Sequence, residues 1–355
     1  MLTSGNYNQL TIQLRSRLNP DRLSLQKSFI DELSTISYSD VLTYIRFAMK
    51  GVEQEYTQQS KLAGENVKKH LSILEDKEFR FQGSVMTNTH IKAYSDIDLL
   101  TISSKFYSWD RSGSERYINE QEFRAKLGSW QLAKLEREKN NFSLYAGNLF
   151  QDLSRLRSDS ESILRSNYKI CDTTKPKSIK ITNQDLRRDV DIVIANWYDD
   201  VRSIINDKDD NRGIQVYNKE TNSQESADYP FISIKKINER GSLTSGRLKK
   251  MIRFIKNIKA DSDRNIDLSS FDVNAICYDI DTTKYQNASF VELVPVIYNQ
   301  LKSICTDSNH ANNVVSVDER EYIFRYNSGK MENIRKVLTE VEAIYLSVRK
   351  VNQYI

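Results

Sequence analysis

The chain contains few residues of the kinds that shape small or specialised folds. Among its 355 residues there are 3 cysteines, 4 prolines and 11 glycines. The cysteines are widely separated and show no Cys-x-x-Cys spacing, which argues against a disulfide framework and against a cysteine zinc site. The low proline and glycine content, together with 39% hydrophobic residues, excludes a collagenous, linker-like or wholly disordered protein.

Long hydrophobic runs and a strong net charge are also missing. No apolar run approaches the roughly 18 to 20 residues needed to cross a bilayer, and residues 1–20 lack the hydrophobic stretch of a secretory signal. The 52 basic and 48 acidic residues leave a net charge of +4, which is too small for a bulk binder of nucleic acid or membrane surfaces. We therefore expect a cytoplasmic protein in which any polyanion site is a local concentration of Lys and Arg.

The length suits about two domains, and the hydrophobic pattern divides the chain in the same way. Apolar residues recur at three and four from residue 40 to 74, which predicts one long helix with Gly51 or Gly64 as a candidate bend. Short apolar blocks then predict four strands, FRFQGS, DIDLLTI, SIKIT and DVDIVIANW, and the last two suit a hairpin or neighbouring antiparallel strands.

Helical patterns fill the remainder of the chain. One lies between the second and third predicted strands, at about 119–168, and is broken near Gly147. The others follow the last strand, at about 245–260, 268–279, 287–306 and 329–351. These patterns predict an α+β protein with a mixed strand-and-helix domain at 1–240 and a helical domain at 241–355.

Two acids on one predicted strand are the clearest chemical signal. In the block QGSVMTNTHIKAYSDIDLLT, the side chains of Asp96 and Asp98 share one face of the strand, and Ile97 and Leu99 face the core. Neighbouring carboxylates repel each other unless a cation neutralises them. Mg²⁺ held by carboxylates and substrate phosphates is the common solution.

The start of the same block provides a phosphate site. Gly83 allows backbone N–H groups to approach a ligand closely, and Ser84 adds a small hydroxyl donor. Gln82, Gly83 and Ser84 are therefore the expected substrate-binding residues, with Ser84 on the β- or γ-phosphate. Tyr94 and Ser95 are weaker candidates for substrate contact.

A third acid is expected on a strand next to the first two. DVDIVIAN offers Asp189 and Asp191, and we choose Asp191 because the apolar run IVIA follows it directly, whereas Asp189 suits the surface at the start of the strand. Asp96, Asp98 and Asp191 together form a predicted two-metal site for in-line attack on an α-phosphate.

These motifs resemble the polymerase-β-type nucleotidyltransferases, and more narrowly the cGAS/DncV-like nucleotidyltransferases of bacterial CBASS anti-phage systems. The resemblance rests on the long helix before FQGS, the QGSVMTNTHIKAYSDIDLL block, DVDIVIAN and the later RLKKMIRFIKNIK. It implies a bilobal fold in which a nucleotidyltransferase core with a long spine helix joins a helical lobe like that of oligoadenylate synthetase or poly(A) polymerase. It also implies that basic residues of RLKKMIRFIKNIK, here Arg253 and Lys256, reach the triphosphate.

The activity implied by the resemblance is the Mg²⁺-dependent condensation of nucleoside triphosphates into a cyclic oligonucleotide second messenger, with release of pyrophosphate. The expected cofactor is a pair of Mg²⁺ ions, with Mn²⁺ as a substitute, and the expected product is a purine cyclic dinucleotide such as c-di-GMP or cGAMP. The enzyme is expected to be a monomer that binds nucleoside triphosphates, but no membrane, no long nucleic acid and not the downstream cyclic-nucleotide receptor.

Two other functions remain open at this point. One is a template-free transferase that acts on an RNA end, an oligoadenylate or a small molecule, and the small positive charge argues against the RNA form. The other is a non-catalytic nucleotide-binding or scaffold protein, against which the retention of three candidate metal acids argues.

Overall fold

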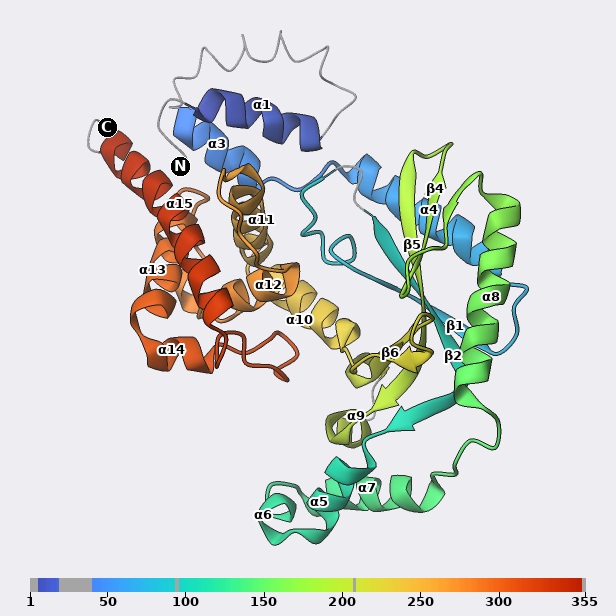
Figure 1. Cartoon of the computed structure of the whole chain (residues 1–355). Coiled ribbons are helices and arrows are strands. Elements are labelled where there is room, and N and C mark those ends of the chain that lie inside the picture. The colour runs from blue at the N-terminus through green and yellow to red at the C-terminus, as the bar shows by residue number, and fades with distance from the viewer. Residues whose placement is uncertain (1–5, 19–39, 93–95, 207–208, 353–355) are drawn as a thin grey trace. The chain divides into compact units, whose positions relative to one another are not determined.

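The computed structural model describes residues 6–18, 40–92, 96–206 and 209–352 (Figure 1). The chain forms two compact units. The helical unit consists of Met1–Thr57, Met86–Ser95 and Lys236–Ile355, and the sheet unit consists of Gln58–Val85 and Asp96–Lys235. The division after Lys235 lies close to the predicted boundary at 240. Residues 6–18 and 40–57, however, group with the C-terminal helices and not with the sheet.

A seven-stranded mixed sheet forms the core of the sheet unit, with the order β1-β2-β5-β4-β3 and with β6 paired to β5 and β7. Its members are β1 (Lys77–Gln82), β2 (Ile97–Trp109), β3 (Ile170–Asp172), β4 (Ile179–Asn183), β5 (Arg188–Asp199), β6 (Gly213–Asn218) and β7 (Ser223–Gln224). β2 and β5 are parallel, whereas β1 is antiparallel to β2 and β4 is antiparallel to β5. The four predicted strands correspond to β1, β2, β4 and β5, and the antiparallel pairing of the last two is confirmed. The α+β fold class is confirmed as well.

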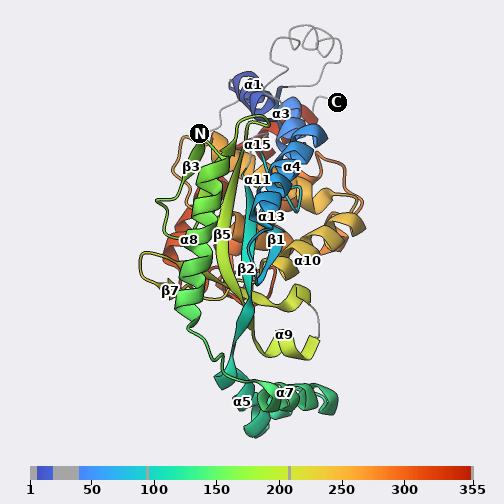
Figure 2. The same cartoon turned by 90° about the vertical axis from the view of Figure 1, so that its right-hand side faces the viewer.

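Helices α4 (Gln54–Leu71) and α8 (Leu149–Asn167) flank the central strands of this sheet (Figure 2). Helix α4 is continuous through Gly64, where the absence of a side chain gives room to β1. A Cβ atom at Gly64 would lie 2.6 Å from Cε1 of Phe81. Gly64 therefore marks a close contact between helix and sheet, and α4 has no break there.

The helical insert of the sheet unit is confirmed, although it begins earlier than predicted. It contains α5 (Arg111–Asn119), α6 (Gln121–Arg124), α7 (Ser129–Asn141) and α8, with a break at 142–148 that includes Gly147. Leu135 of α7 is fully buried against Val201 and Ile205 of α9 (Val201–Asn206). The long strand β2 leads into this insert, since it extends to Trp109.

The helical unit has one extensive apolar core. Its helices are α1 (Tyr7–Leu18), α3 (Asp40–Met49), α11 (Arg247–Asp261), α12 (Ser270–Tyr278), α13 (Leu293–Thr306), α14 (Ser308–Asn313), α15 (Ser328–Asn352) and most of α10 (Pro230–Leu243). Helix α11 is central, with Leu248, Met251, Ile252, Phe254 and Ile258 all fully buried. The four predicted C-terminal helices correspond to α11, α12, α13 and α15, whereas α10 and α14 were not predicted.

The helix predicted from residue 40 to 74 is two helices, α3 and α4, separated at residues 50–53, a stretch that includes Gly51, one of the two candidate bends. The cause is visible at the end of α3, where its last carbonyl groups bond to side chains of α11. Asn257 Nδ2 donates to the Ala48 carbonyl at 2.9 Å, and Arg253 Nε donates to the Met49 carbonyl at 2.9 Å. Because a helix leaves its final carbonyls unpaired, these donors stabilise a helix end at this position.

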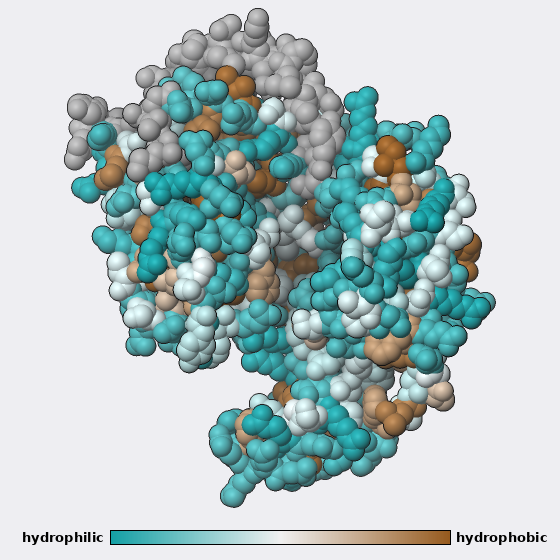
Figure 3. Space-filling model, in the orientation of Figure 1, coloured by the Kyte–Doolittle hydropathy of each residue, from teal (hydrophilic) through white to brown (hydrophobic). Residues whose placement is uncertain are grey.

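Within the described residues, no helix is both long enough and apolar enough to cross a membrane. On the face shown in Figure 3, hydrophobic residues form small separate spots within a mostly hydrophilic surface.

Candidate active site

The strands β2 and β5 bring the predicted acids together. These strands are parallel, and their register places Asp98 directly beside Asp191. The neighbours of each acid along the strand, Ile97 and Leu99 on β2 and Val190 and Ile192 on β5, are fully buried. Because side chains alternate along a strand, Asp98 and Asp191 project from the opposite face of the sheet, and Asp96, two residues before Asp98, lies on their side. The prediction that Asp191 occupies a strand adjacent to Asp98 is confirmed.

The Gly83 turn touches this acid cluster. Gln82 is the register partner of Asp98 across the β1–β2 ladder, and the chain turns at Gly83 and Ser84 directly after β1. Gly83 has a φ of +92°, and a Cβ atom there would lie 2.8 Å from Oδ2 of Asp98. Both the backbone conformation and the proximity of Asp98 therefore require glycine at this position.

Two lysines that the sequence analysis did not select pair with the acids. Lys180 Nζ on β4 lies 2.8 Å from Oδ2 of Asp96 and 2.9 Å from Oδ2 of Asp189. Lys175 Nζ lies 3.5 Å from Oδ1 of Asp191. A signal for Lys180 was present, since it alternates with two isoleucines in SIKIT. Only the β4–β5 register, in which Lys180 is the partner of Asp191, assigns it to the acids.

The acid cluster carries an unfavourable concentration of negative charge. Burial, followed by the Asp191 and Asp96 carboxylates, raises the pKa of Asp98 from 3.8 to about 7, although Lys175 opposes this rise. Burial also raises the pKa of Asp191, against the opposing effect of Lys175. At neutral pH the site is therefore prepared to accept positive charge.

The donor set fits a hard divalent cation. All three acids offer carboxylate oxygens, which Mg²⁺ prefers, and the buried Oδ1 of Asp191 has only the long ion pair to Lys175 at 3.5 Å. In the part of the chain that the structure describes, no three His, Cys, Asp or Glu side chains converge as a metal-binding group. The carboxylates of Asp96 and Asp191 pair with Lys180 and Lys175 instead. A metal ion can bind these carboxylates only if the two lysine side chains move away. The role of the acids as metal ligands stays a prediction.

Arg253 and Lys256, which the resemblance placed at the triphosphate, lie on α11 in the helical unit and are largely buried. Arg253 Nη1 donates to the Asn88 carbonyl at 2.6 Å, and Lys256 Nζ donates to the Thr89 carbonyl at 3.3 Å. Burial lowers the pKa of Lys256 to about 8. Both side chains thus hold backbone segments of their own unit, and their contact with substrate stays a prediction. Tyr94 and Ser95 lie outside the described residues.

Known proteins resemble this chain along most of its length. Residues 235–346 match the family model of the cGAS/DncV-like nucleotidyltransferase C-terminal helical domain. A c-di-GMP synthase of Capnocytophaga granulosa is 49% identical over 348 residues, which cover 97% of this chain and 98% of that protein.

Two solved structures are similar in both sequence and fold. The STING-associated CdnE c-di-GMP synthase from Capnocytophaga granulosa has a TM-score of 0.79 and 46% identity, with 98% of this chain and 99% of that chain covered. A STING-associated CdnE c-di-GMP synthase from Flavobacteriaceae sp. has a TM-score of 0.87 and 38% identity, with 97% and 98% covered. On this similarity, the chain belongs to the cGAS/DncV-like nucleotidyltransferases and is an enzyme of that family.

Proposed function

We propose that this nucleotidyltransferase is a Mg²⁺-dependent c-di-GMP synthase. It condenses two GTP molecules into the cyclic dinucleotide and releases two pyrophosphates. In each step a ribose hydroxyl oxygen of one nucleotide bonds to the α-phosphorus of the other, and the bond from that phosphorus to the bridging oxygen of the pyrophosphate breaks.

The pairing of Asp98 with Asp191 on parallel strands, with Asp96 on the same side, is the observation that carries this proposal. Nucleotidyltransferases of this family are generally metal dependent. The three carboxylates would hold two Mg²⁺ ions, which when bound neutralise the charge that develops on the phosphates.

The site residues have different roles in metal binding, activation of the hydroxyl and phosphate binding. Asp96 and Asp98 would hold both cations, and Asp191 would help to activate the attacking ribose hydroxyl. Ser84 donates its hydroxyl group to the β- or γ-phosphate, and the open backbone at Gly83 brings N–H groups close to the same phosphates.

The choice of GTP rests on the relatives, three of which carry the name c-di-GMP synthase at 49%, 39% and 38% identity. The two solved structures named STING-associated support a further part of the proposal, which concerns the receptor of the product. The released product acts on a separate STING-type receptor in anti-phage signalling, and the synthase itself works as a monomer.

The test supplies α-³²P-labelled GTP, ATP, CTP and UTP, singly and mixed, to the purified full chain. Products are treated with phosphatase and identified by chromatography and mass spectrometry. We expect GTP alone to give a phosphatase-resistant product with the mass of c-di-GMP, and only when Mg²⁺ or Mn²⁺ is present. Asp98→Asn should lower the yield at least about 10³-fold, whereas Asp185→Asn, at an exposed position in the β4–β5 turn, should match the wild type.

The alternatives predict different outcomes of the same test. A product that requires ATP or a pyrimidine nucleotide would contradict the choice of GTP and leave the reaction class intact. A product that forms only when RNA or a small acceptor is added would identify an acceptor-dependent transferase. Full yield from Asp98→Asn would refute the assignment of the site.

A further inference from the structure

The loop between β3 and β4 presents Lys175 to the acid cluster. Its Nζ lies 3.5 Å from Oδ1 of Asp191, and 43% of its side chain remains exposed. The lysine is therefore close enough to neutralise the acid and still free to reach a ligand. Its neighbour on the loop, Lys177, pairs with Glu225 at 3.0 Å instead.

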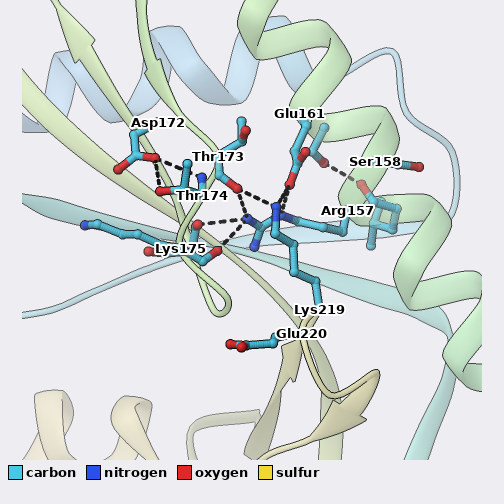
Figure 4. Close-up of polar contacts among 12 residues, drawn as sticks. Arg157, Ser158, Glu161, Asp172, Thr173, Thr174, Lys175, Lys219 and Glu220 are labelled. Carbon is cyan, nitrogen blue, oxygen red and sulfur yellow. Dashed lines mark hydrogen bonds and ion pairs between the residues drawn. The ribbon is translucent and has the colours of Figure 1, made fainter.

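A buried arginine holds the backbone of this loop. Arg157 on α8 has a side chain that is only 3% exposed. Its Nη2 donates to the carbonyls of Lys175 and Ser178, both at 2.9 Å, and more weakly to that of Thr173 at 3.4 Å (Figure 4). Its Nε donates to Oε1 of Glu161 at 2.7 Å, which fixes the orientation of the guanidinium group.

Lys219 holds the loop from a second direction. Its Nζ donates to Oε1 of Glu161 at 2.9 Å and also to the Thr173 carbonyl (Figure 4). Its backbone N–H donates to the Pro176 carbonyl at 3.0 Å. The side chains of Arg157 and Lys219 therefore both bond the loop that carries Lys175, and both also bond the carboxylate of Glu161.

This arrangement is costly if its only purpose is stability. A buried charge loses its hydration, and a buried polar atom without a partner adds a further penalty. Arg157 has both disadvantages, because its Nη1 is buried without a hydrogen-bond partner. Its donors nevertheless converge on the carbonyls of one short loop. These bonds fix the backbone from which the Lys175 side chain extends.

We propose that Lys175 binds a nucleotide phosphate during the reaction and that Arg157 is the positioning residue that holds it in place. In the absence of metal, Lys175 is the counter-ion of Asp191. When a divalent cation binds the Asp191 carboxylate, two positive charges would compete there, and Lys175 moves to the phosphate that arrives with the nucleotide. This inference rests on the proposed function, since it assumes a metal and a nucleotide at this site.

The first test compares Lys175→Met with the matched variant Lys177→Met. Mn²⁺ binding is measured by electron paramagnetic resonance without nucleotide, and binding of a non-hydrolysable GTP analogue is measured by calorimetry with saturating Mn²⁺. Lys175→Met should tighten Mn²⁺ binding by about threefold to tenfold and weaken analogue binding by about the same factor. Lys177→Met should change neither. The proposal is overturned if Lys175→Met leaves both affinities unchanged or moves both in the same direction.

The second test asks whether Arg157 acts through Lys175. Arg157→Lys keeps the charge but cannot bond the same set of carbonyls, so it should reproduce part of both shifts, whereas Arg155→Met, at an exposed position on the same helix, should not. The double variant Arg157→Lys/Lys175→Met should bind Mn²⁺ and the analogue no differently from Lys175→Met alone. Additive effects would refute the positioning role. A wild-type chain that binds Mn²⁺ and the analogue but makes no c-di-GMP would refute the proposed function and leave this inference standing.

Discussion

Replacing Asp98 with asparagine should stabilise the metal-free protein while abolishing synthesis. Burial and the neighbouring Asp191 and Asp96 raise the pKa of Asp98 from 3.8 to about 7. The folded protein therefore holds the Asp98 proton more tightly than the unfolded chain does. Its stability falls as pH rises from about 4 to about 7 and stays low above that range. Asparagine has a similar shape and no charge, so it removes this penalty.

The size of the effect follows from the two pKa values. The difference between 3.8 and about 7 sets a ceiling of about 4 kcal/mol, and partial exposure with screening by Lys175 reduces it to about 2 kcal/mol at pH 8. At pH 4 the gain should be only about 0.5 kcal/mol, because the Asp98 carboxyl is protonated in the folded protein there and only about half ionised in the unfolded chain.

Urea unfolding in EDTA measures this gain, and tryptophan fluorescence suits it. All three tryptophans, Trp109, Trp130 and Trp197, belong to the sheet unit that carries Asp98. The control is Asp185→Asn, which should leave the curve unchanged at both pH values. A loss of stability in Asp98→Asn, or a gain of equal size at pH 4 and pH 8, would contradict the raised pKa of Asp98.

Three further predictions concern the same cluster. Gly83→Ala should cost about 1 to 2 kcal/mol from its positive φ and lower synthesis by about tenfold to a hundredfold by displacing Asp98. Gly246→Ala, at a φ of +78° with open space around it, should show only the stability cost, and equal synthesis by the two variants would contradict the contact. Mg²⁺ binding at pH 6 should release about one proton from Asp98 and almost none at pH 8.5, measured by calorimetry in buffers of different ionisation enthalpy; equal release at both pH values would contradict the raised pKa. Lys180→Met should lower the stability of the metal-free protein by about 1 kcal/mol at pH 8, and saturating Mg²⁺ should restore it; a deficit that persists with Mg²⁺ would mean that Lys180 acts through packing.

The acids could be predicted because strand alternation links sequence to geometry at short range. Asp96 and Asp98 share a face through their spacing alone, and the apolar residues after Asp191 identify its strand as buried. The pairing of Asp98 with Asp191 is different, since it depends on hydrogen bonds between strands that are distant in the chain. The expectation of an adjacent strand came from the chemistry of a two-metal site and not from periodicity.

The break between α3 and α4 shows where periodicity fails. The apolar pattern continues through residues 50–53, so the sequence favours one helix, with Gly51 as one of two candidate bends. The donors that end α3 come from Arg253 and Asn257, about two hundred residues later in the chain. A helix end that is capped by remote side chains leaves little local signal, because the usual capping residues act within one turn.

The lysines at the acids were missed for a related reason. A lysine beside an isoleucine normally indicates only the solvent face of a strand, and Lys175 lies in a loop with no periodicity at all. Lys175 lies near Asp191 because Arg157 and Lys219 bond the backbone of its loop. Arg157 belongs to α8, and Lys219 lies in the turn after β6. The net charge of +4 conceals this arrangement. At the site, Lys175 pairs with Asp191 and Lys180 pairs with Asp96, and such pairs are the ones that a bound cation and a triphosphate can exchange without leaving either sign of charge buried alone.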